Sequence, residues 1–182
     1  MPRLPELDPD TLTPEQQRVF DTITNGPRGS VRGPFAALLH CPGVADYVQA
    51  TGIHLRFDGV LPGELRELAI LTTARFWKAD YEWNAHVPFA KKEGLDPAVI
   101  DAIGEGKTPD FTDDDEKAVH AFITGLHRDH RVSDAAFDAI KDAFGEEATL
   151  ELTALAGYYT LMSMVLNTIE VQPPEGGTTF TK

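Results

Sequence analysis

Cysteine is almost absent from this sequence, which has a single one, Cys41, among its 182 residues. One thiol cannot close an intrachain disulfide, so a disulfide-stabilised secreted scaffold is excluded. Basic residues are also scarce: 16 Lys and Arg stand against 29 Asp and Glu, which gives a formal net charge of −13. Such a surface repels phosphate backbones and anionic headgroups, so we expect no nucleic-acid partner and no membrane partner.

Long apolar runs are missing as well. No stretch approaches the roughly 20 uninterrupted apolar residues that a membrane helix requires, and the N-terminal residues lack an apolar signal core. We therefore expect a cytoplasmic protein. No stretch shows the period-two alternation, bounded by hairpin turns, that is typical of β-strands.

The sequence is instead rich in helical periodicity. We predict an all-α fold with one compact domain of about eight or nine helices over residues 13–171, an extended arm over residues 1–12 and a flexible tail over residues 172–182. The apolar content of 42% is enough for a substantial core. A domain of this size buries roughly 70% of its unfolded surface, so it needs no structural metal.

The most informative stretch runs from Glu64 to Gly94. It predicts two helices joined by a tight turn, with Asp80 as the N-cap of the second helix and Gly94 as its end. Glu82 and His86 stand four residues apart on the second helix, so they share one face. A carboxylate beneath an imidazole orients the ring and raises its basicity.

The first of these helices carries Glu67, Leu71 and Arg75 at successive four-residue steps. If this face meets the face of Glu82 and His86, two carboxylates, an imidazole and a guanidinium converge. That set suits proton transfer, with His86 moving the proton and Arg75 holding a substrate carboxylate in bidentate fashion. The alternative is a structural ion-pair network between two packed helices.

The same stretch resembles the carboxymuconolactone decarboxylase family, which includes the alkylhydroperoxidase D type enzymes. The motifs that carry the resemblance are Arg66–Leu71, Tyr81–Trp83, His86 and Gly94-Leu95, extended by Pro34–Leu39, Arg131–Asp134, Gly157–Tyr159 and Val165–Asn167. The resemblance implies an AhpD-like helical fold and a homo-oligomer, a trimer or a hexamer. It also implies a role as a lyase in the degradation of aromatic compounds.

The peroxidase branch of this family has a Glu, a Cys-x-x-Cys pair and a His four residues after the second Cys. Glu67 and His86 stand at the matching positions, whereas Ala79 and Glu82 occupy the two cysteine positions. Thiol peroxidase chemistry requires both thiols, one to attack the peroxide and one to resolve the sulfenic acid. The resemblance therefore points to the decarboxylase-like branch that lacks the pair.

That branch implies an enzyme without metal or organic cofactor that acts on a small unsaturated organic acid or lactone. The resemblance makes His86 the catalytic acid and base, with Glu82 and Glu67 as its partners. We expect the substrate-binding residues to be Arg75, Trp83, Tyr158 and Asn167. For Trp83 a place in the core, and for Asn167 a hydrogen bond within the core, remain open alternatives.

Other patterns carry weaker functional signals. His120, His127 and His130, with Glu116, lie on one expected helix, but no third ligand is at hand, so a solvated polar face is the preferred interpretation over a metal site. Residues 29–33 superficially resemble a phosphate loop but lack its Gly-Lys-Ser/Thr ending and a preceding strand.

Two alternative functions remain open. One is a non-catalytic helical oligomer that binds a small ligand. The other is an alkylhydroperoxidase or peroxiredoxin-type antioxidant activity in which Cys41 works with an external thiol. A lone cysteine beside a helix start is either an inert packed residue or a thiol activated by the helix N-terminus.

Overall fold

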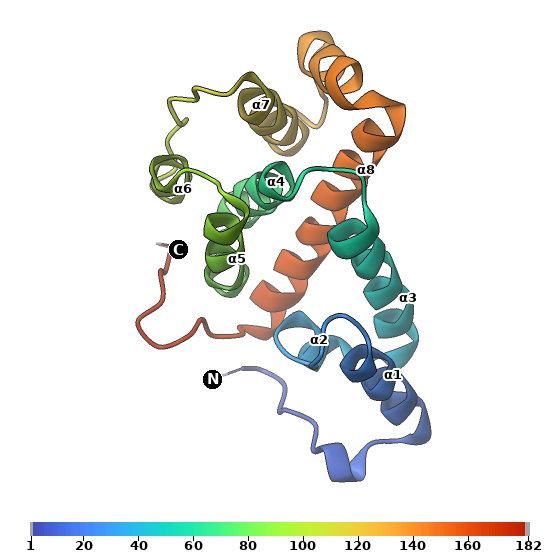
Figure 1. Cartoon of the computed structure of the whole chain (residues 1–182). Helices are drawn as coiled ribbons and strands as arrows, with labels where there is room; N and C mark the ends of the chain where they lie inside the picture. The colour runs from blue at the N-terminus through green and yellow to red at the C-terminus, as the bar shows by residue number, and fades with distance from the viewer. Residues whose placement is uncertain (1, 181–182) are drawn as a thin grey trace.

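The predicted all-α architecture is confirmed by a computed structural model, which describes residues 2–180 (Figure 1). This part of the chain forms eight α-helices and no strand. The helices are α1 (Pro14–Asn25), α2 (Pro34–Leu38), α3 (Pro42–Ile53), α4 (Gly63–Phe76), α5 (Asp80–Glu93), α6 (Pro97–Gly104), α7 (Asp114–Asp129) and α8 (Asp134–Ile169). A short 3₁₀ turn, η1 (Pro9–Thr11), precedes them, and a π-helical segment, η2 (His54–Asp58), continues α3.

Helix α4 lies at the centre of the fold, between α5, α6, α7 and α8 (Figure 1). Its apolar residues are buried around most of the circumference, as expected of a helix enclosed by others. Thr72 and Thr73 are buried with them, and each hydroxyl donates a hydrogen bond to the carbonyl four residues earlier. Glu67 is charged and yet buried on this helix, so its carboxylate requires a hydrogen-bonding or ionic partner.

Helix α8 is broken at Gly145, where φ is 86°. The sequence predicts two helices that meet at this glycine, and the kink bears that out, since only glycine adopts such a backbone without strain. The helix is long and apolar enough, by length and composition, to pass for a membrane span. Its buried face packs against α2, α4, α5 and α7, which is how the core helix of a globular domain behaves.

Helix α5 carries two of the expected catalytic side chains. Pro88 lies inside it, and the helix continues through the proline to Glu93. Gly94 ends the helix in the left-handed conformation, as predicted. Asp80 is not the N-cap that we predicted: Ala79 takes that position, and the Asp80 carboxylate instead accepts a hydrogen bond from the backbone N–H of Phe180.

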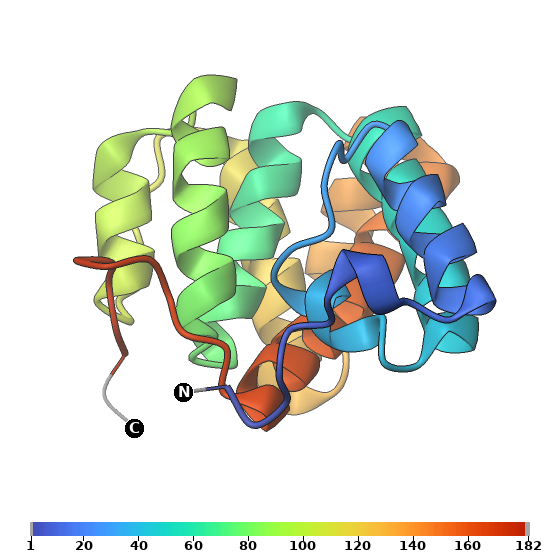
Figure 2. The ribbon, with the colours of Figure 1, turned by 90° about the horizontal axis from the view of Figure 1, so that it is seen from below.

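The C-terminal segment lies along α5 (Figure 2). Asn84 exchanges two hydrogen bonds with the backbone of Thr178, at 2.8 and 2.9 Å. The ring of Phe180 packs edge-on against Trp83 and is 9% exposed. The tail is therefore held in place as far as Phe180, where we had predicted a flexible segment, because the sequence gives no sign of its partners on α5.

The N-terminal arm reaches the end of α8, where the backbone N–H of Arg3 donates to the Ile169 carbonyl. Helix α1 then begins with the capping box predicted from Thr13 and Gln16, and both of its hydrogen bonds are formed. Helices α1, α2 and α3 cover the α8 side of the domain opposite α6 and α7 (Figure 1). The loop that enters α2 and the π-helical η2 both face α5, and this arrangement forms the functional cavity.

Candidate active site

His86 lies between two carboxylates that come from different helices. Its Nδ1 is 2.7 Å from Glu67 Oε2 on α4, and its Nε2 is 3.3 Å from Glu82 Oε1 on α5. All three side chains are buried, with exposed fractions of 3–4%. The convergence predicted from the sequence is therefore present, and Glu82 reaches the ring because four residues bring it onto the same helix face.

The geometry at the two nitrogens assigns them different roles. A carboxylate only accepts, so the 2.7 Å contact with Glu67 requires the proton on Nδ1 of His86. Nε2 and Glu82 Oε1 can hold a second proton between them, since either atom can carry it. Glu82 and His86 both line a cavity, whereas Glu67 lies behind the ring. The Nε2–Glu82 proton is thus the one that a molecule in the cavity can exchange.

The environment favours the charged form of His86. Burial alone lowers the pKa of the imidazole, but the hydrogen bonds and charges of Glu67 and Glu82 outweigh it and raise the pKa above its ordinary value. The ring of Tyr159 packs edge-on against the imidazole at 5.1 Å and fixes its plane. Burial also raises the pKa of the Tyr159 hydroxyl well above its usual value, so this group stays neutral.

The cavity has a volume of about 460 Å³, which suits a small organic molecule. Helix α5 forms one wall, the loop before α2 and η2 form others, and Tyr158 and Tyr159 from α8 close it. Pro174 of the C-terminal segment stands at its rim. Tyr158 is the member of the predicted substrate-binding set that the structure places here.

Three arginines line the cavity that we did not predict as site residues: Arg28, Arg32 and Arg56. Arg32 lies in the loop that we considered and set aside as a phosphate loop, Arg28 directly precedes that loop, and Arg56 lies in the π-helical segment. These segments have no motif in common, and Arg28 meets Tyr158 across 130 residues of sequence. The one available signal was the concentration of arginine and glycine over residues 28–33.

Two glycines allow this wall to form. Gly33 has a φ of 57°, and a Cβ there would overlap the ring of Tyr81, which also lines the cavity. A Cβ on Gly52 would overlap both the hydroxyl of Tyr158 and the guanidinium of Arg28. The close approach of α3 to this pair therefore requires glycine.

Arg75 does not reach the cavity, contrary to our expectation. Its Nε donates to the Gly104 carbonyl at 3.0 Å, and its guanidinium lies 4.8 Å from the ring centre of Phe180. The physical reason is helical drift: eight residues turn Arg75 about 80° away from Glu67. Arg75 thus joins α4 to α6 and to the C-terminal segment.

Trp83 and Asn167 also lie outside the cavity. Trp83 is buried in the core beside Phe180, since it directly follows Glu82 and so faces another side of α5. Asn167 donates to the carbonyl of Trp77 at 2.8 Å and links α8 to the end of α4. Trp83 therefore takes the alternative place in the core, whereas Asn167 is exposed and its hydrogen bond does not lie within the core, contrary to both expectations for that residue.

Residues 2–180 contain no group of three His, Cys, Asp or Glu side chains placed to hold a metal ion. Two histidines of α7 have separate contacts. His127 contacts the hydroxyl of Thr73 at 3.1 Å and stacks on Phe76, and His120 packs against Phe111. Burial lowers the pKa of both imidazoles.

Cys41 is exposed and precedes α3. It borders a second, apolar cavity of about 360 Å³ between the N-terminal arm, α2 and the end of α8, and not the cavity that holds His86. The positions at which a peroxidase would carry its thiols, Ala79 and Glu82, are the N-cap of α5 and the partner of His86.

The all-α fold that buries the carboxylate–imidazole site is of the AhpD-like type. The crystal structure of an alkylhydroperoxidase AhpD core, an uncharacterized peroxidase-related protein from Ralstonia eutropha JMP134, superposes with a TM-score of 0.76 at 22% identity, and the alignment covers 96% of this chain and 93% of that one. Residues 42–123 match the carboxymuconolactone decarboxylase family, the family that the sequence resembles. No curated protein matches the sequence significantly.

Proposed function

We propose that this protein is a cytoplasmic, cofactor-free acid/base enzyme, a decarboxylase or isomerase of a small unsaturated organic acid or lactone. The observation that carries the proposal is the 3.3 Å contact between His86 Nε2 and Glu82 Oε1 at the wall of a cavity. Glu67 holds the opposite side of the ring, so the imidazole presents Nε2 to the ligand in one orientation. The raised pKa of His86 extends to higher pH the range over which the imidazole carries its second proton.

In a decarboxylation, the bond between the substrate and its carboxylate breaks and carbon dioxide leaves. The electron pair of that bond enters the conjugated system of the substrate, and the remote carbon takes the proton from the His86–Glu82 pair. In an isomerisation, the pair first removes a proton from one carbon and returns it to another. Both reactions balance without an oxidant, a reductant or a metal.

Turnover of carboxymuconolactone and of a panel of small unsaturated acids tests the proposal. We expect His86→Gln to lower the rate about 10²–10⁴-fold, the usual contribution of a general acid/base. Glu82→Gln is expected to act in the same direction. His130→Asn is the matched control, because His130 is exposed at the end of α7 in a left-handed conformation that asparagine tolerates. Unchanged turnover in His86→Gln would refute the acid/base role.

The structural likeness to a peroxidase-related protein supports a second candidate, a hydroperoxide reductase. In this chain such a reaction would depend on Cys41 with an external thiol, because Ala79 and Glu82 carry no sulfur. Peroxide consumption in the presence of dithiothreitol, compared between the wild type and Cys41→Ser, separates the two candidates. Peroxide turnover that is lost in Cys41→Ser and kept in His86→Gln would favour the reductase.

A further inference from the structure

The cavity wall carries an excess of positive charge in a strongly acidic protein. Its charged lining consists of Arg28, Arg32 and Arg56 against one carboxylate, Glu82, beside His86. The chain as a whole has a net charge of −13. Three guanidinium groups at one cavity therefore contrast with the acidic composition of the chain as a whole. Their positive charge lowers the energy of an anion inside the cavity.

Arg28 is held in place without an acidic partner among residues 2–180. One of its nitrogens, Nη2, donates to the hydroxyl of Tyr158 at 3.0 Å, and its guanidinium lies 4.4 Å from the ring centre of Phe35. Its Nε is buried without a hydrogen-bond partner among residues 2–180. A buried guanidinium donor is costly to leave unpaired, so this atom is the clearest sign of a missing ligand.

Arg56 stands on another side of the same cavity. It lies over the rings of Phe57 and Phe89, at 5.2 and 5.3 Å, and forms no ion pair within the described part of the chain. Arg28, Arg56 and Glu82 all act electrostatically on the hydroxyl of Tyr158. The two arginines and the carboxylate of Glu82 thus surround one shared space.

The remaining walls are mostly flat and apolar. The rings of Phe35, Phe57, Phe89 and Tyr81 line the cavity together with Met162. Aromatic walls favour a planar, unsaturated ligand body, and guanidinium groups favour a carboxylate, with which they form paired hydrogen bonds.

We propose that Arg28 and Arg56 form an anion subsite that binds the carboxylate of a planar, conjugated organic acid and turns its unsaturated body toward His86 and Glu82. The inference shares its cavity with the proposed function, but it concerns binding and does not require the reaction. Arg32, which is exposed at the rim, adds to the attraction without a fixed contact.

Binding of two matched probes tests the subsite: trans-cinnamate, a planar conjugated carboxylate, and cinnamamide, its neutral counterpart of the same shape. We expect calorimetric titration of the full chain to show cinnamate binding at least about tenfold tighter than cinnamamide, the effect of one good charge-assisted hydrogen-bonded pair. Arg28→Gln and Arg56→Gln are each expected to remove most of this preference and to leave the affinity for cinnamamide unchanged.

Three variants make the result specific. Arg128→Gln removes an exposed arginine that pairs with Asp129 outside the cavity, and it is expected to keep the full preference. Tyr158→Phe removes the hydroxyl partner of Arg28 but keeps the charge, so it is expected to weaken the preference only in part. Arg56→Gln changes a half-buried side chain without a hydrogen bond to lose, which makes it the safer variant if Arg28→Gln does not fold.

His86→Gln separates this inference from the proposed function. We expect this variant to prefer cinnamate over cinnamamide by a smaller factor, whether or not the acid/base reaction is correct, because both arginines are intact although Glu67 and Glu82 lose their cationic partner. Equal affinities for the two probes, no detectable cinnamate binding, or an unchanged preference in both arginine variants would overturn the subsite. Displacement of cinnamate by inorganic phosphate at a comparable concentration would assign the arginines to a phosphate ligand and overturn the carboxylate assignment.

Discussion

At the scale of single residues, the proposed chemistry of this protein depends on a histidine whose two nitrogens face different glutamates. Glu67 contacts the ring from behind, and Glu82 contacts it at the cavity. Together they raise the pKa of His86 above its ordinary value, against the effect of burial. The imidazolium therefore persists to a higher pH than it would in an unfolded chain.

Replacement of Glu67 by glutamine is expected to lower the pKa of His86, because it removes the shorter of the two contacts and one negative charge. Side-chain NMR of ¹⁵N-labelled histidine, followed over pH, measures this change directly. Glu93→Gln is a suitable control, because Glu93 lies at the end of α5, away from the ring. A pKa of His86 that is the same in Glu67→Gln and in the wild type would contradict the assignment.

The raised pKa of His86 in the wild type also affects the stability of the fold. Because the folded-state pKa of His86 is raised, the native state binds this proton more tightly than the unfolded state does. The stabilisation is fully present below about pH 6.5, the ordinary value for histidine. It is lost as the pH rises through the higher folded-state pKa, so the difference in stability between the wild type and His86→Gln should shrink over that range.

Single residues show most clearly which parts of the site could be predicted from the sequence. Glu82 and His86 could be paired from their four-residue spacing, and Glu67 could be added from the family motif. Arg28, Arg56 and Tyr158 could not be brought together, since no local spacing relates a loop, a π-helical segment and the last helix. Arg75 was misplaced because the four-residue step ignores the drift of a real helix over two turns.

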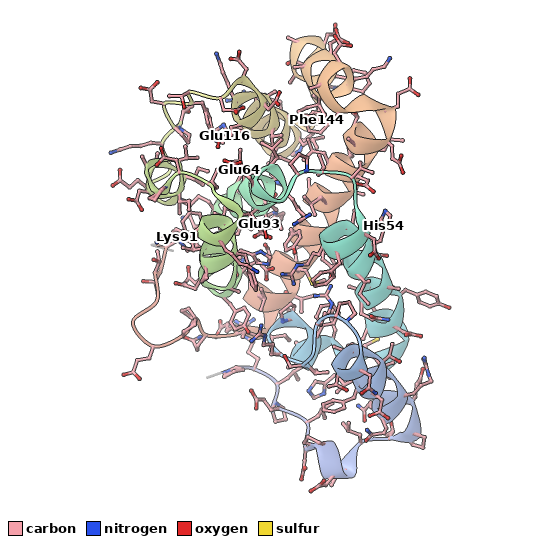
Figure 3. All side chains as sticks on the ribbon, in the orientation of Figure 1. His54, Glu64, Lys91, Glu93, Glu116 and Phe144 are labelled. Carbon is pink, nitrogen blue, oxygen red and sulfur yellow. The ribbon has the colours of Figure 1, made fainter. Side chains whose placement is uncertain are left out.

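At the scale of helices, the contact between α4 and α7 contains a second buried titratable group. Glu116 on α7 is 6% exposed and lies beside Glu64 at the start of α4 (Figure 3). Burial, followed by the hydrogen bond with Glu64 and its charge, raises the pKa of Glu116 to about 7. The folded chain therefore holds a proton on Glu116 between about pH 4.5 and 7 that the unfolded chain has released.

Because the native state binds more protons over this range, the free energy of unfolding falls as the pH rises from about 4.5 to 7. Glu116→Gln keeps the shape and the hydrogen-bond capacity but cannot ionise. We expect it to raise the melting temperature at pH 8 by about 2–4 °C, the usual effect of about 1 kcal/mol in a chain of this size. At pH 5 it should change the melting temperature little.

Thermal unfolding at the two pH values checks this prediction, with Glu105→Gln as a control because Glu105 is exposed and pairs with Lys107. A variant that is destabilised equally at both pH values would show that the Glu116 carboxyl is ionised and well paired in the native state.

The sequence predicted most elements at this scale within a few residues, because caps and glycine breaks mark their ends. Thr13, Ser133, Gly94 and Gly145 all behave as predicted. The partners of the C-terminal segment could not be predicted, because Asp80, Asn84 and Trp83 lie about a hundred residues away and have competing local roles.

At the scale of the whole molecule, apolar side chains remain exposed on the last half of α8. Leu161 and Met164 are 37% and 46% exposed, and both border the apolar cavity beside α2. We propose that this face mediates self-association into the trimer or hexamer that the family resemblance implies, since an exposed apolar groove is typical of an interface.

Sedimentation velocity at micromolar concentration is expected to give a mass well above the 20.0 kDa monomer. Met164→Glu should shift the distribution toward the monomer, because it places a charge in the apolar groove. Leu150→Glu, on the same helix but outside that groove, is the matched control. A clean monomer for the wild type would contradict the proposed assembly.

The position of Arg28 has one more consequence. Glu67, Glu82 and His86 belong to a rigid helical hairpin inside the family-matched residues 42–123, whereas Arg28 precedes that segment in a glycine-bearing loop. Evolution, or an engineer, can therefore exchange residues 27–33 and change which molecules are accepted while the proton-handling hairpin stays as it is. A scaffold divided in this way is well suited to acquiring new substrates by loop replacement alone.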